Sequence, residues 1–163
     1  MPNVAIITCS DKGHAGARED KAGPAIRHIL EAHGYSVVEQ ILLPDDQARI
    51  EAAMKRLCDE VGVNLICTTG GTGFSTRDVT PEATLAVVER LCPGIPEAIR
   101  AYSLTITPRA MLSRAVAGIR GRTLIVNLPG SPKAVTECLE YAIDALGHGL
   151  DILLGKDAEC ARV

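Results

Sequence analysis

Short apolar runs alternate with segments of helical periodicity along this chain. Val4 to Cys9 and Leu65 to Thr68 are apolar runs of strand length, and each is followed by polar sequence that carries glycine. Between them, apolar residues recur at helical spacing over positions 50–61. Strands that alternate with helices form parallel sheets covered on both faces. We therefore predict one α/β domain over residues 1–163, with three layers and a mostly parallel central sheet flanked by helices.

The remaining elements follow from the same patterns. Asp46 is expected to cap the helix that follows it, and Gly34 to end the helix before it. Residues 115–127 are expected to form a hairpin. The expected helices are Gly23 to Ala32, a continuation of the post-glycine helix from Thr84 to Leu91, Glu97 to Leu104, Arg109 to Ser113 and a last helix from Ser131-Pro132. The expected strands are Tyr35 to Leu43, Ala115 to Ile119 and Thr123 to Asn127.

Composition and charge narrow the classes of function. The 163 residues are 47% hydrophobic but only 2% aromatic, so the core is expected to be aliphatic. A net charge of −3 and a pI near 5.8 argue against general binding to nucleic acid or to anionic membranes. The first apolar stretch is short and follows no basic region, which predicts a cytoplasmic protein without a signal peptide or membrane span.

Cysteines and histidines give weaker signals. No C-x-x-C pair occurs, which favours reduced and mostly buried thiols over zinc ligation or disulfides. The histidines form no metal motif and are interpreted as structural or surface residues. The cysteines are Cys9, Cys58, Cys67, Cys92, Cys138 and Cys160, and the histidines are His14, His28, His33 and His148.

A glycine-rich loop after the strand at 65–68 is the most specific signal for a binding site. Gly70, Gly71 and Gly73 permit positive φ angles and close backbone approach, so successive N–H groups can surround an anion. Thr80 is expected as the N-cap of the following helix and Pro81 as its first residue, which adds unpaired N–H groups that favour phosphate.

Two charged residues lie in this loop. Arg77 can bind phosphate through two hydrogen bonds, whereas the carboxylate of Asp78 repels phosphate unless it holds Mg²⁺ or handles a proton. The loop is therefore interpreted as a magnesium-nucleotide site. A tight turn with an exposed ion pair is the alternative, and the loop lacks both the G-x-x-x-x-G-K-[ST] pattern and the third glycine of the dinucleotide fingerprint.

Other polar loops are expected to meet this one beyond the carboxyl ends of the strands. Pro129, Gly130 and Ser131 repeat the order of strand, glycine turn and proline-started helix, so two helix starts are expected to face a ligand with more than one phosphate. Asp45 is either a second carboxylate for magnesium or proton transfer or a plain turn residue. The loop from Ser10 to Lys21 carries charges of both signs, and taken by itself it is better explained as a solvated loop than as part of a site.

Several ordered motifs together resemble the molybdopterin adenylyltransferase family over nearly the whole chain, from Val4 to about Leu146. They are Thr69-Gly70-Gly71-Thr72-Gly73, Arg77-Asp78-Val79-Thr80-Pro81-Glu82-Ala83-Thr84, Asn127-Leu128-Pro129-Gly130-Ser131-Pro132, Ser10-Asp11-Lys12, Glu19-Asp20-Lys21-Ala22-Gly23 and Pro44-Asp45.

The resemblance implies a molybdopterin-binding, Rossmann-like fold that transfers AMP from Mg-ATP to the terminal phosphate of molybdopterin and releases pyrophosphate. By motif position, Asp45 and Asp78 are the expected catalytic and metal-handling carboxylates, with Asp78 as the main magnesium organiser. The resemblance also implies a homotrimer or hexamer, with contact to the molybdenum-insertion enzyme and molybdopterin synthase. The expected ligand-binding residues are Ser10, Asp11, Lys12, Thr69, Gly70, Gly71, Thr72, Gly73, Arg77, Pro129, Gly130 and Ser131.

Three other interpretations belong to different classes. A molybdopterin carrier or assembly protein without turnover predicts pterin binding but no magnesium-dependent use of ATP. A nicotinamide-dependent oxidoreductase predicts binding of NAD without any effect of pterin. A structural oligomer predicts no stabilisation by ligands.

Overall fold

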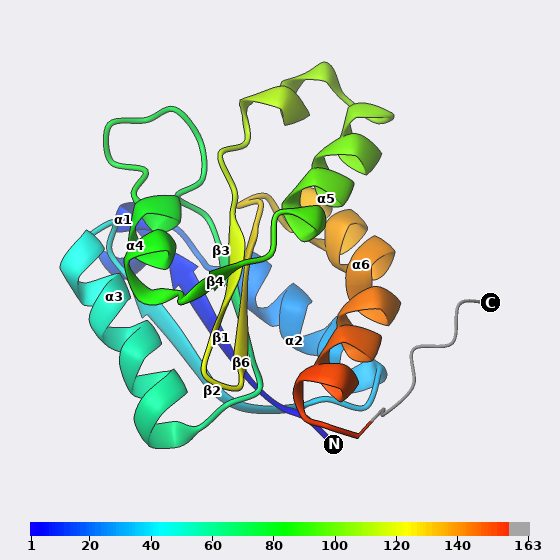
Figure 1. The fold of residues 1–163 in the computed structure, drawn as a ribbon. Helices are drawn as coiled ribbons and strands as arrows, with labels where there is room; N and C mark the ends of the chain where they lie inside the picture. The colour runs from blue at the N-terminus through cyan, green and yellow to red at the C-terminus, as the bar shows by residue number, and fades with distance from the viewer. Residues whose placement is uncertain (157–163) are drawn as a thin grey trace.

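Strands and helices alternate along the computed structural model, which describes residues 1–156 (Figure 1). The elements, in chain order, are β1 (Asn3–Cys9), α1 (Asp11–His14), α2 (Ala22–Ala32), β2 (Ser36–Leu43), α3 (Gln47–Arg56), the π-helix η1 (Leu57–Val61), β3 (Leu65–Thr69), α4 (Thr80–Val87), β4 (Arg90–Leu91), α5 (Gly94–Leu104), the 3-10 helix η2 (Pro108–Leu112), β5 (Ala117–Arg120), β6 (Thr123–Leu128) and α6 (Pro132–Leu153).

The strands form one sheet in the order β2-β1-β3-β6-β5-β4. The pairs β1/β2, β1/β3 and β3/β6 are parallel, while β5 pairs antiparallel with both β6 and β4. Thr8 lies opposite Thr69, and Thr69 lies opposite Leu128, so the carboxyl ends of three central strands meet at one edge. The predicted α/β class with a mostly parallel sheet is confirmed.

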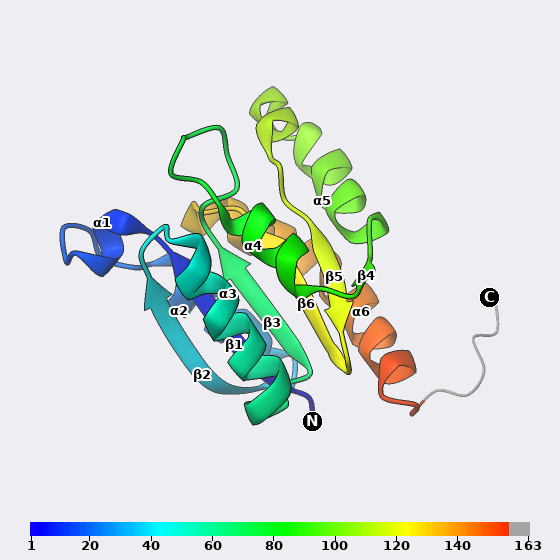
Figure 2. The ribbon, with the colours of Figure 1, turned by 60° about the vertical axis from the view of Figure 1, so that its left-hand side comes forward.

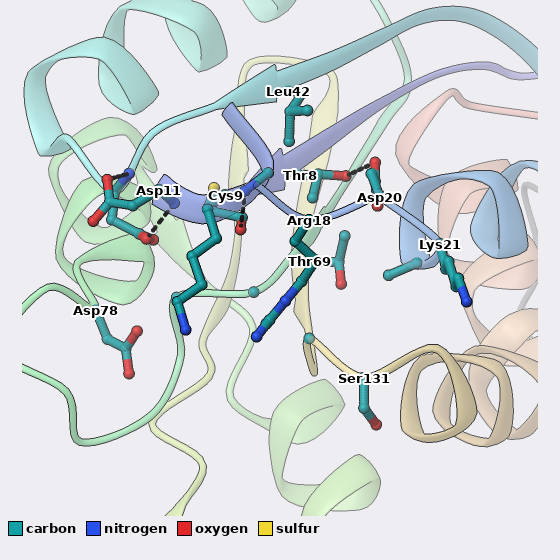
Figure 3. A pocket seen from close by; sticks show the side chains of 18 of the residues that line it. Thr8, Cys9, Asp11, Arg18, Asp20, Lys21, Leu42, Thr69, Asp78 and Ser131 are labelled. Carbon is teal, nitrogen blue, oxygen red and sulfur yellow. Dashed lines mark hydrogen bonds between the residues drawn. The ribbon is translucent and has the colours of Figure 1, made fainter. Parts of the chain in front are cut away.

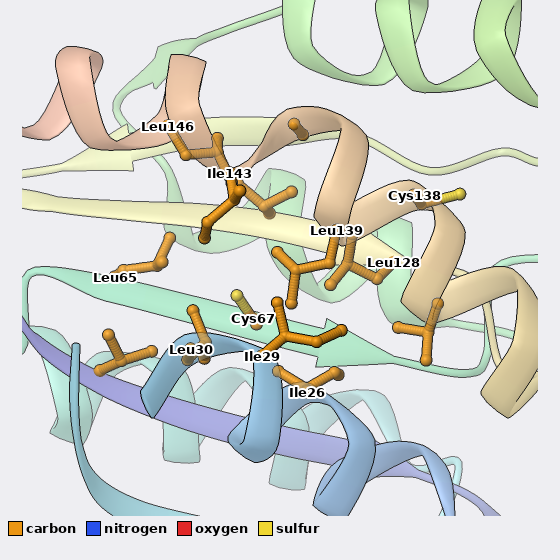
Figure 4. Packing of buried hydrophobic residues seen from close by; sticks show 14 of the residues in the cluster. Ile26, Ile29, Leu30, Leu65, Cys67, Leu128, Cys138, Leu139, Ile143 and Leu146 are labelled. Carbon is orange, nitrogen blue, oxygen red and sulfur yellow. The ribbon is translucent and has the colours of Figure 1, made fainter. Parts of the chain in front are cut away.

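Helices cover both faces of the sheet, as Figures 1 and 2 show. Residues of β1 alternate between the two faces: Val4 and Ile6 pack with α2 and α6, whereas Ala5 and Ile7 pack with α3 and α4. All four side chains are fully buried. Figure 4 shows the larger cluster, where aliphatic side chains of α2 and α6 meet those of β3 and β6. The predicted aliphatic core is confirmed.

The thiols follow the expected pattern within the described part of the chain. Cys9, Cys67 and Cys138 are buried and Cys58 and Cys92 are partly buried, all of them as free thiols. Burial raises the pKa of Cys9 and of Cys67 to about 12, so both thiols are protonated at neutral pH. Cys160 lies outside the described residues.

Local signals predicted several element ends correctly. The side chain of Asp46 caps α3 by accepting a hydrogen bond from the N–H of Arg49, and Ser131 caps α6. Gly34 follows α2 with a φ of 81°. The hairpin of β5 and β6 turns at Gly121, as expected. Within residues 1–156, no helix is both long enough and apolar enough to cross a bilayer.

Other ends were predicted wrongly. The helix after the glycine loop stops at Val87, and Arg90 begins a short edge strand instead of continuing the helix to Leu91. Helix α5 starts at Gly94, before the expected Glu97. The polar loop after Ser10 contains a short helix, α1, that the sequence did not reveal.

Candidate functional site

A pocket of about 980 Å³ opens at the carboxyl ends of β1 and β3 (Figure 3). From β1 the chain goes to β2, which pairs along one edge of β1. It then returns past β1 to β3, which pairs along the other edge of β1. This reversal is the position at which open α/β sheets bind ligands. The pocket is lined by the ends of both strands, by α1 and the segment up to Ala22, by the glycine loop and by the start of α6.

The glycine loop begins with two residues in the left-handed region. Gly70 has a φ of 86° and Gly71 a φ of 69°. A Cβ atom on Gly70 would lie 2.4 Å from the carbonyl oxygen of Cys9, and one on Gly71 would lie 2.3 Å from Oγ1 of Thr80. Both positions therefore require glycine for two reasons, conformation and space. Gly73 is not in the left-handed region, contrary to the expectation for that residue.

The turn between β6 and α6 packs directly on this loop. A Cβ atom on Gly130 would lie 3.3 Å from the Cα of Gly70. Thr69 connects the two turns, because its Oγ1 donates a hydrogen bond to the carbonyl of Pro129 at 2.7 Å. Oγ of Ser131 accepts a hydrogen bond from the N–H of Ala134 at 3.1 Å. The start of α6 thus borders the pocket with the positive end of its dipole.

The second expected helix start is arranged differently. Thr80 is the first residue of α4 and not its N-cap, and its Oγ1 donates to the carbonyl of Gly70 at 3.0 Å. Thr80 and Pro81 do not line the pocket, so of the two expected helix starts only that of α6 faces it.

Asp11 and Asp45 hold each other through their backbones. The N–H of Asp45 donates to Oδ1 of Asp11, and the N–H of Asp11 donates to Oδ2 of Asp45, both at 3.0 Å. The other oxygen of Asp45, Oδ1, is buried without a hydrogen-bond partner among residues 1–156. Burial raises the pKa of Asp45, and the nearby charges of Asp11 and Asp78 raise it further. Such a carboxylate is suited to bind a cation or to exchange a proton.

Asp78 lies on the returning arm of the glycine loop, toward the same end of the pocket as Asp11 (Figure 3). Its Oδ2 accepts a hydrogen bond from the N–H of Ser75 at 3.1 Å, which fixes the side chain relative to its own loop. The structure therefore brings the predicted pair Asp45 and Asp78 to one pocket, with Asp11 as a third carboxylate.

Arg77 reaches the pocket but binds a carboxylate there. Its Nε and Nη2 donate to the two oxygens of Asp11 at 2.9 and 3.1 Å. This hydrogen bond is the main cause that lowers the pKa of Asp11. The guanidinium must leave or share this partner if it is to contact phosphate, and no sequence pattern predicted this competition.

Sequence reasoning missed other pocket residues. Arg18 and Lys21 add positive charge to the lining, and Figure 3 shows Arg18 extending toward Thr69. Asp20 accepts hydrogen bonds from Oγ1 of Thr8 at 2.8 Å and from the N–H of Gly23 at 2.9 Å. The family resemblance included Asp20 and Lys21, but no spacing signal in the polar loop placed them at the site.

Three expected ligand-binding residues lie away from this pocket. Thr72, Gly73 and Pro129 line a second cavity of about 280 Å³ beneath α5 and η2. The glycine loop therefore borders two cavities, with Gly70 and Gly71 on one and Thr72 and Gly73 on the other. The remaining expected residues, Ser10, Asp11, Lys12, Thr69, Gly70, Gly71, Arg77, Gly130 and Ser131, all line the first pocket.

Comparison with known proteins shows which family the chain belongs to. Residues 5–148 match a family described as a probable molybdopterin binding domain. The chain is 40% identical over 156 residues to the molybdopterin adenylyltransferase of Helicobacter pylori strain J99, a match that covers 94% of this chain and 89% of that protein. The corresponding enzyme of Escherichia coli K12 is 44% identical over 147 residues, covering 89% and 75% of the two chains.

Solved structures extend the likeness to the fold. The molybdopterin biosynthesis enzyme MoaB of Thermus thermophilus is 45% identical to this chain, with a TM-score of 0.91. The match covers 98% of this chain and 100% of that one. The Mog protein of Mycobacterium ulcerans is 40% identical, with a TM-score of 0.88 over 94% and 99% of the two chains. With its matched sequence and fold, the chain belongs to the molybdopterin adenylyltransferase family.

Proposed function

We propose that this protein transfers AMP from Mg-ATP to the terminal phosphate of molybdopterin, giving adenylyl-molybdopterin and pyrophosphate in molybdenum cofactor biosynthesis. Relatives named molybdopterin adenylyltransferase support the reaction class. The structural observation that carries the proposal is the unpaired, buried Oδ1 of Asp45 beside the Gly70–Gly71 turn. This places a carboxylate that suits a cation next to a backbone that suits a phosphate.

The reaction requires two polyanions to approach each other. An oxygen of the pterin phosphate attacks the α-phosphorus of ATP, and the bond from that phosphorus to the bridging oxygen breaks as pyrophosphate leaves. The N–H groups of the Gly70–Gly71 turn and the start of α6 would bind phosphate oxygens, while Lys12 and Arg18 reduce the repulsion. The substrate phosphate is itself the nucleophile, so no side chain of the protein has to form a covalent intermediate.

The residues present fit a magnesium ion that is shared with substrate. Among residues 1–156, no group of three metal-ligating side chains could hold an ion by itself. Mg²⁺ in nucleotide sites commonly takes one or two carboxylates and completes its shell with phosphate oxygens and water. Oδ1 of Asp45 and the carboxylate of Asp78 would supply these protein ligands. When bound, the ion neutralises charge on the phosphates.

The same proposal includes a single domain over residues 1–163 in the cytoplasm, assembled as a homotrimer or hexamer. Exposed apolar side chains around the end of α5 and η2 support self-association, since such patches commonly mark protein interfaces. These side chains are Leu104, Ile106, Met111 and Leu112. Contact with the molybdenum-insertion enzyme and molybdopterin synthase follows from the proposed place of the reaction in the pathway.

The decisive experiment incubates the purified protein anaerobically with molybdopterin, ATP and Mg²⁺, and detects the products by mass. Formation of adenylyl-molybdopterin and pyrophosphate only when all three are present is the expected result. Tight pterin binding without product would instead identify a carrier. NAD binding without a pterin effect would favour an oxidoreductase, and no stabilisation by any ligand would favour a structural oligomer.

Asp78→Asn tests the proposed role of this carboxylate. The variant keeps the shape of the side chain and an acceptor for Ser75, so the fold is expected to be preserved. Adenylyl transfer is expected to fall roughly 10²-fold or more, because a charged group at the reacting phosphates is lost. Asp59→Asn, at a surface ion pair with Arg120, is the matched control and should retain full activity. A folded and fully active Asp78→Asn protein would refute the assignment.

A further inference from the structure

The glycine loop projects from the sheet and is held at few points. Phe74, Ser75, Thr76 and Arg77 are exposed, with Phe74 at 70% exposure. At the base of the loop, Thr80 donates hydrogen bonds from its N–H to the carbonyl of Gly71 at 3.1 Å and from its Oγ1 to that of Gly70. These contacts close the base of the loop, and nearer its tip Asp78 and Ser75 exchange two hydrogen bonds.

Arg114, far away in the sequence, joins the two arms of the loop. Its N–H donates to the carbonyl of Thr72 at 2.8 Å, and its Nε donates to that of Gly73 at 2.7 Å, both on the outgoing arm. Its Nη2 donates to the carbonyl of Asp78 itself at 2.9 Å, on the returning arm. Its Nη1 pairs with Glu82 in the first turn of α4.

The segment that carries Arg114 is itself anchored. The N–H of Val116 donates to Oδ1 of Asn127 at 3.2 Å, and Asn127 is buried between Thr68 and Thr84. Nη1 of Arg100 donates to the carbonyl of Ala115 at 2.8 Å. Arg114 therefore extends from a fixed support, and its planar guanidinium reaches three separate acceptors at once.

The ion pair that joins the glycine loop to α1 is weak, and ligands would compete with it. Arg77 and Asp11 are 62% and 41% exposed, and an exposed ion pair contributes little stability. Phosphate would compete with Asp11 for the guanidinium of Arg77. Arg114 does not line the pocket, so a phosphate bound there would not compete directly for its guanidinium.

We propose that Arg114 is a positioning residue that holds the returning arm, and with it the carboxylate of Asp78, in place before substrate binds. Arg114 does not line the substrate pocket and acts through the backbone of Asp78. The proposal rests on the proposed function for its kinetic consequence. Its structural consequence, a loop made rigid by one distant guanidinium, is independent of the reaction.

The test uses Arg114→Gln and Arg114→Lys, with Arg120→Gln as the matched control. Arg120 also binds one carboxylate, that of Asp59, and one backbone carbonyl, that of Val87, but it lies away from the pocket. Hydrogen exchange of the Ser75 and Asp78 amides, measured without ligands, reports the loop directly. Arg114→Gln loses the two charge-assisted hydrogen bonds to the carbonyls of Gly73 and Asp78, which is expected to speed exchange of these amides at least about tenfold. In Arg120→Gln the exchange is expected to be unchanged.

The kinetic readout separates positioning from general stability. In Arg114→Gln, kcat for adenylyl transfer is expected to fall roughly 10²-fold, and half-maximal activity should require more Mg²⁺ because Asp78 is less well placed. Arg114→Lys retains the charge for Glu82 but cannot span the carbonyls of Gly73 and Asp78. It is expected to regain thermal stability without regaining kcat, while Arg120→Gln loses stability without losing kcat.

The outcomes that overturn the proposal are distinct from those that overturn the function. Wild-type exchange rates at Ser75 and Asp78 in both Arg114 variants would refute the rigid-loop inference. An equal loss of kcat in Arg120→Gln would show that only stability is involved, which also refutes it. If the wild-type protein made no adenylyl-molybdopterin, the proposed function would fail, while the exchange measurement would still decide the role of Arg114 in the loop.

Discussion

Two turns of similar sequence border the pocket, and they are stabilised in different ways. The turn from β6 to α6 is short, and its own residues complete it: Ser131 caps the helix that it begins. The loop from β3 to α4 spans residues 70–79, and the side chain of Thr80, the first residue of α4, caps no helix. Its shape depends on Arg114, from a part of the chain that is remote in sequence. The same residue pattern thus encodes a local turn in one place and a tertiary arrangement in the other.

The largest difference in stability is expected when a glycine of each turn is replaced by alanine. In Gly70→Ala, a left-handed φ and a clash with the carbonyl of Cys9 combine, so we expect a loss of about 3 to 5 kcal/mol in the free energy of unfolding. Gly130→Ala has no positive φ, and its neighbour must move only slightly, so a loss below about 1.5 kcal/mol is expected. Urea denaturation measures both.

Gly62→Ala serves as the control for that measurement. Gly62 has a φ of 72°, but an added Cβ atom there would meet open space, so the variant isolates conformational strain, at about 1 to 2 kcal/mol. Equal losses in Gly70→Ala and Gly62→Ala would show that the contact with Cys9 contributes nothing.

The cap of the short turn predicts a smaller and local effect. Ser131→Ala removes the acceptor for the N–H of Ala134 and should lower the unfolding free energy by about 1 kcal/mol. Ser131→Asn keeps an acceptor and should restore stability. Exchange of the Ala134 amide should rise in the first variant only, without change at Ser75 in the long loop. A rise at both positions would mean that the two turns are coupled.

Asp45 beneath the long loop predicts a dependence on pH. Burial raises the pKa of Asp45 in the folded protein. Its contribution to the free energy of unfolding is therefore fully present below the pKa that the group has in the unfolded chain, and it is lost as the pH rises through the pKa in the folded protein. Asp45→Asn keeps an acceptor for the N–H of Asp11, and because the amide does not ionise, the variant does not lose stability in this way as the pH rises. We expect the variant to be at least as stable as wild type at neutral pH, with reduced adenylyl transfer.

Unfolding free energies of both proteins from about pH 4 to about pH 8 test this sign. A variant whose deficit grows with rising pH would show that ionised Asp45 stabilises the fold, against the prediction.

The smallest effect on stability is expected at the link across the pocket. Arg77→Gln breaks an exposed ion pair and should leave the unfolding transition almost unchanged. The pKa of Asp11, now lowered by Arg77, should return toward its ordinary value, which titration followed by NMR measures. An Asp11 that titrates as before would mean that the N–H of Asp45 alone sets its pKa.

Much of the fold is predictable because its signals are local. The apolar runs of β1 and β3, the cap at Asp46 and the proline-started helix after Ser131 each depend on neighbours in sequence. Two failures have tertiary causes: Arg90 joins the sheet because β5 offers an edge for pairing, and the hydroxyl of Thr80 binds the backbone of Gly70 instead of its own helix. The motifs around the glycine pattern predicted a group of residues, most of which the structure brings together at one pocket.

The supporting contacts of the pocket were out of reach for sequence reasoning. Arg114 binds backbone carbonyls, and a carbonyl leaves no residue-type signal that a sequence pattern could reveal. The pairing of Arg77 with Asp11 likewise joins two loops whose relative positions only the sheet order determines. The residues that form the turns could therefore be predicted from the sequence, whereas the groups that hold the longer loop in place could not.

Arg114 lies far from the glycine loop in sequence, and this separation affects how the loop folds during translation. During translation the strands β1, β2 and β3 and the glycine loop leave the ribosome before Arg114 does, as the chain order requires. Until β5 and β6 dock on the sheet, the nascent loop lacks the hydrogen bonds by which Arg114 joins its two arms, because long-range contacts form only after the intervening chain is ordered. We therefore expect the loop to reach its final shape late in folding, and a chain arrested before Arg114 would present the glycine loop without the contacts that hold its two arms together.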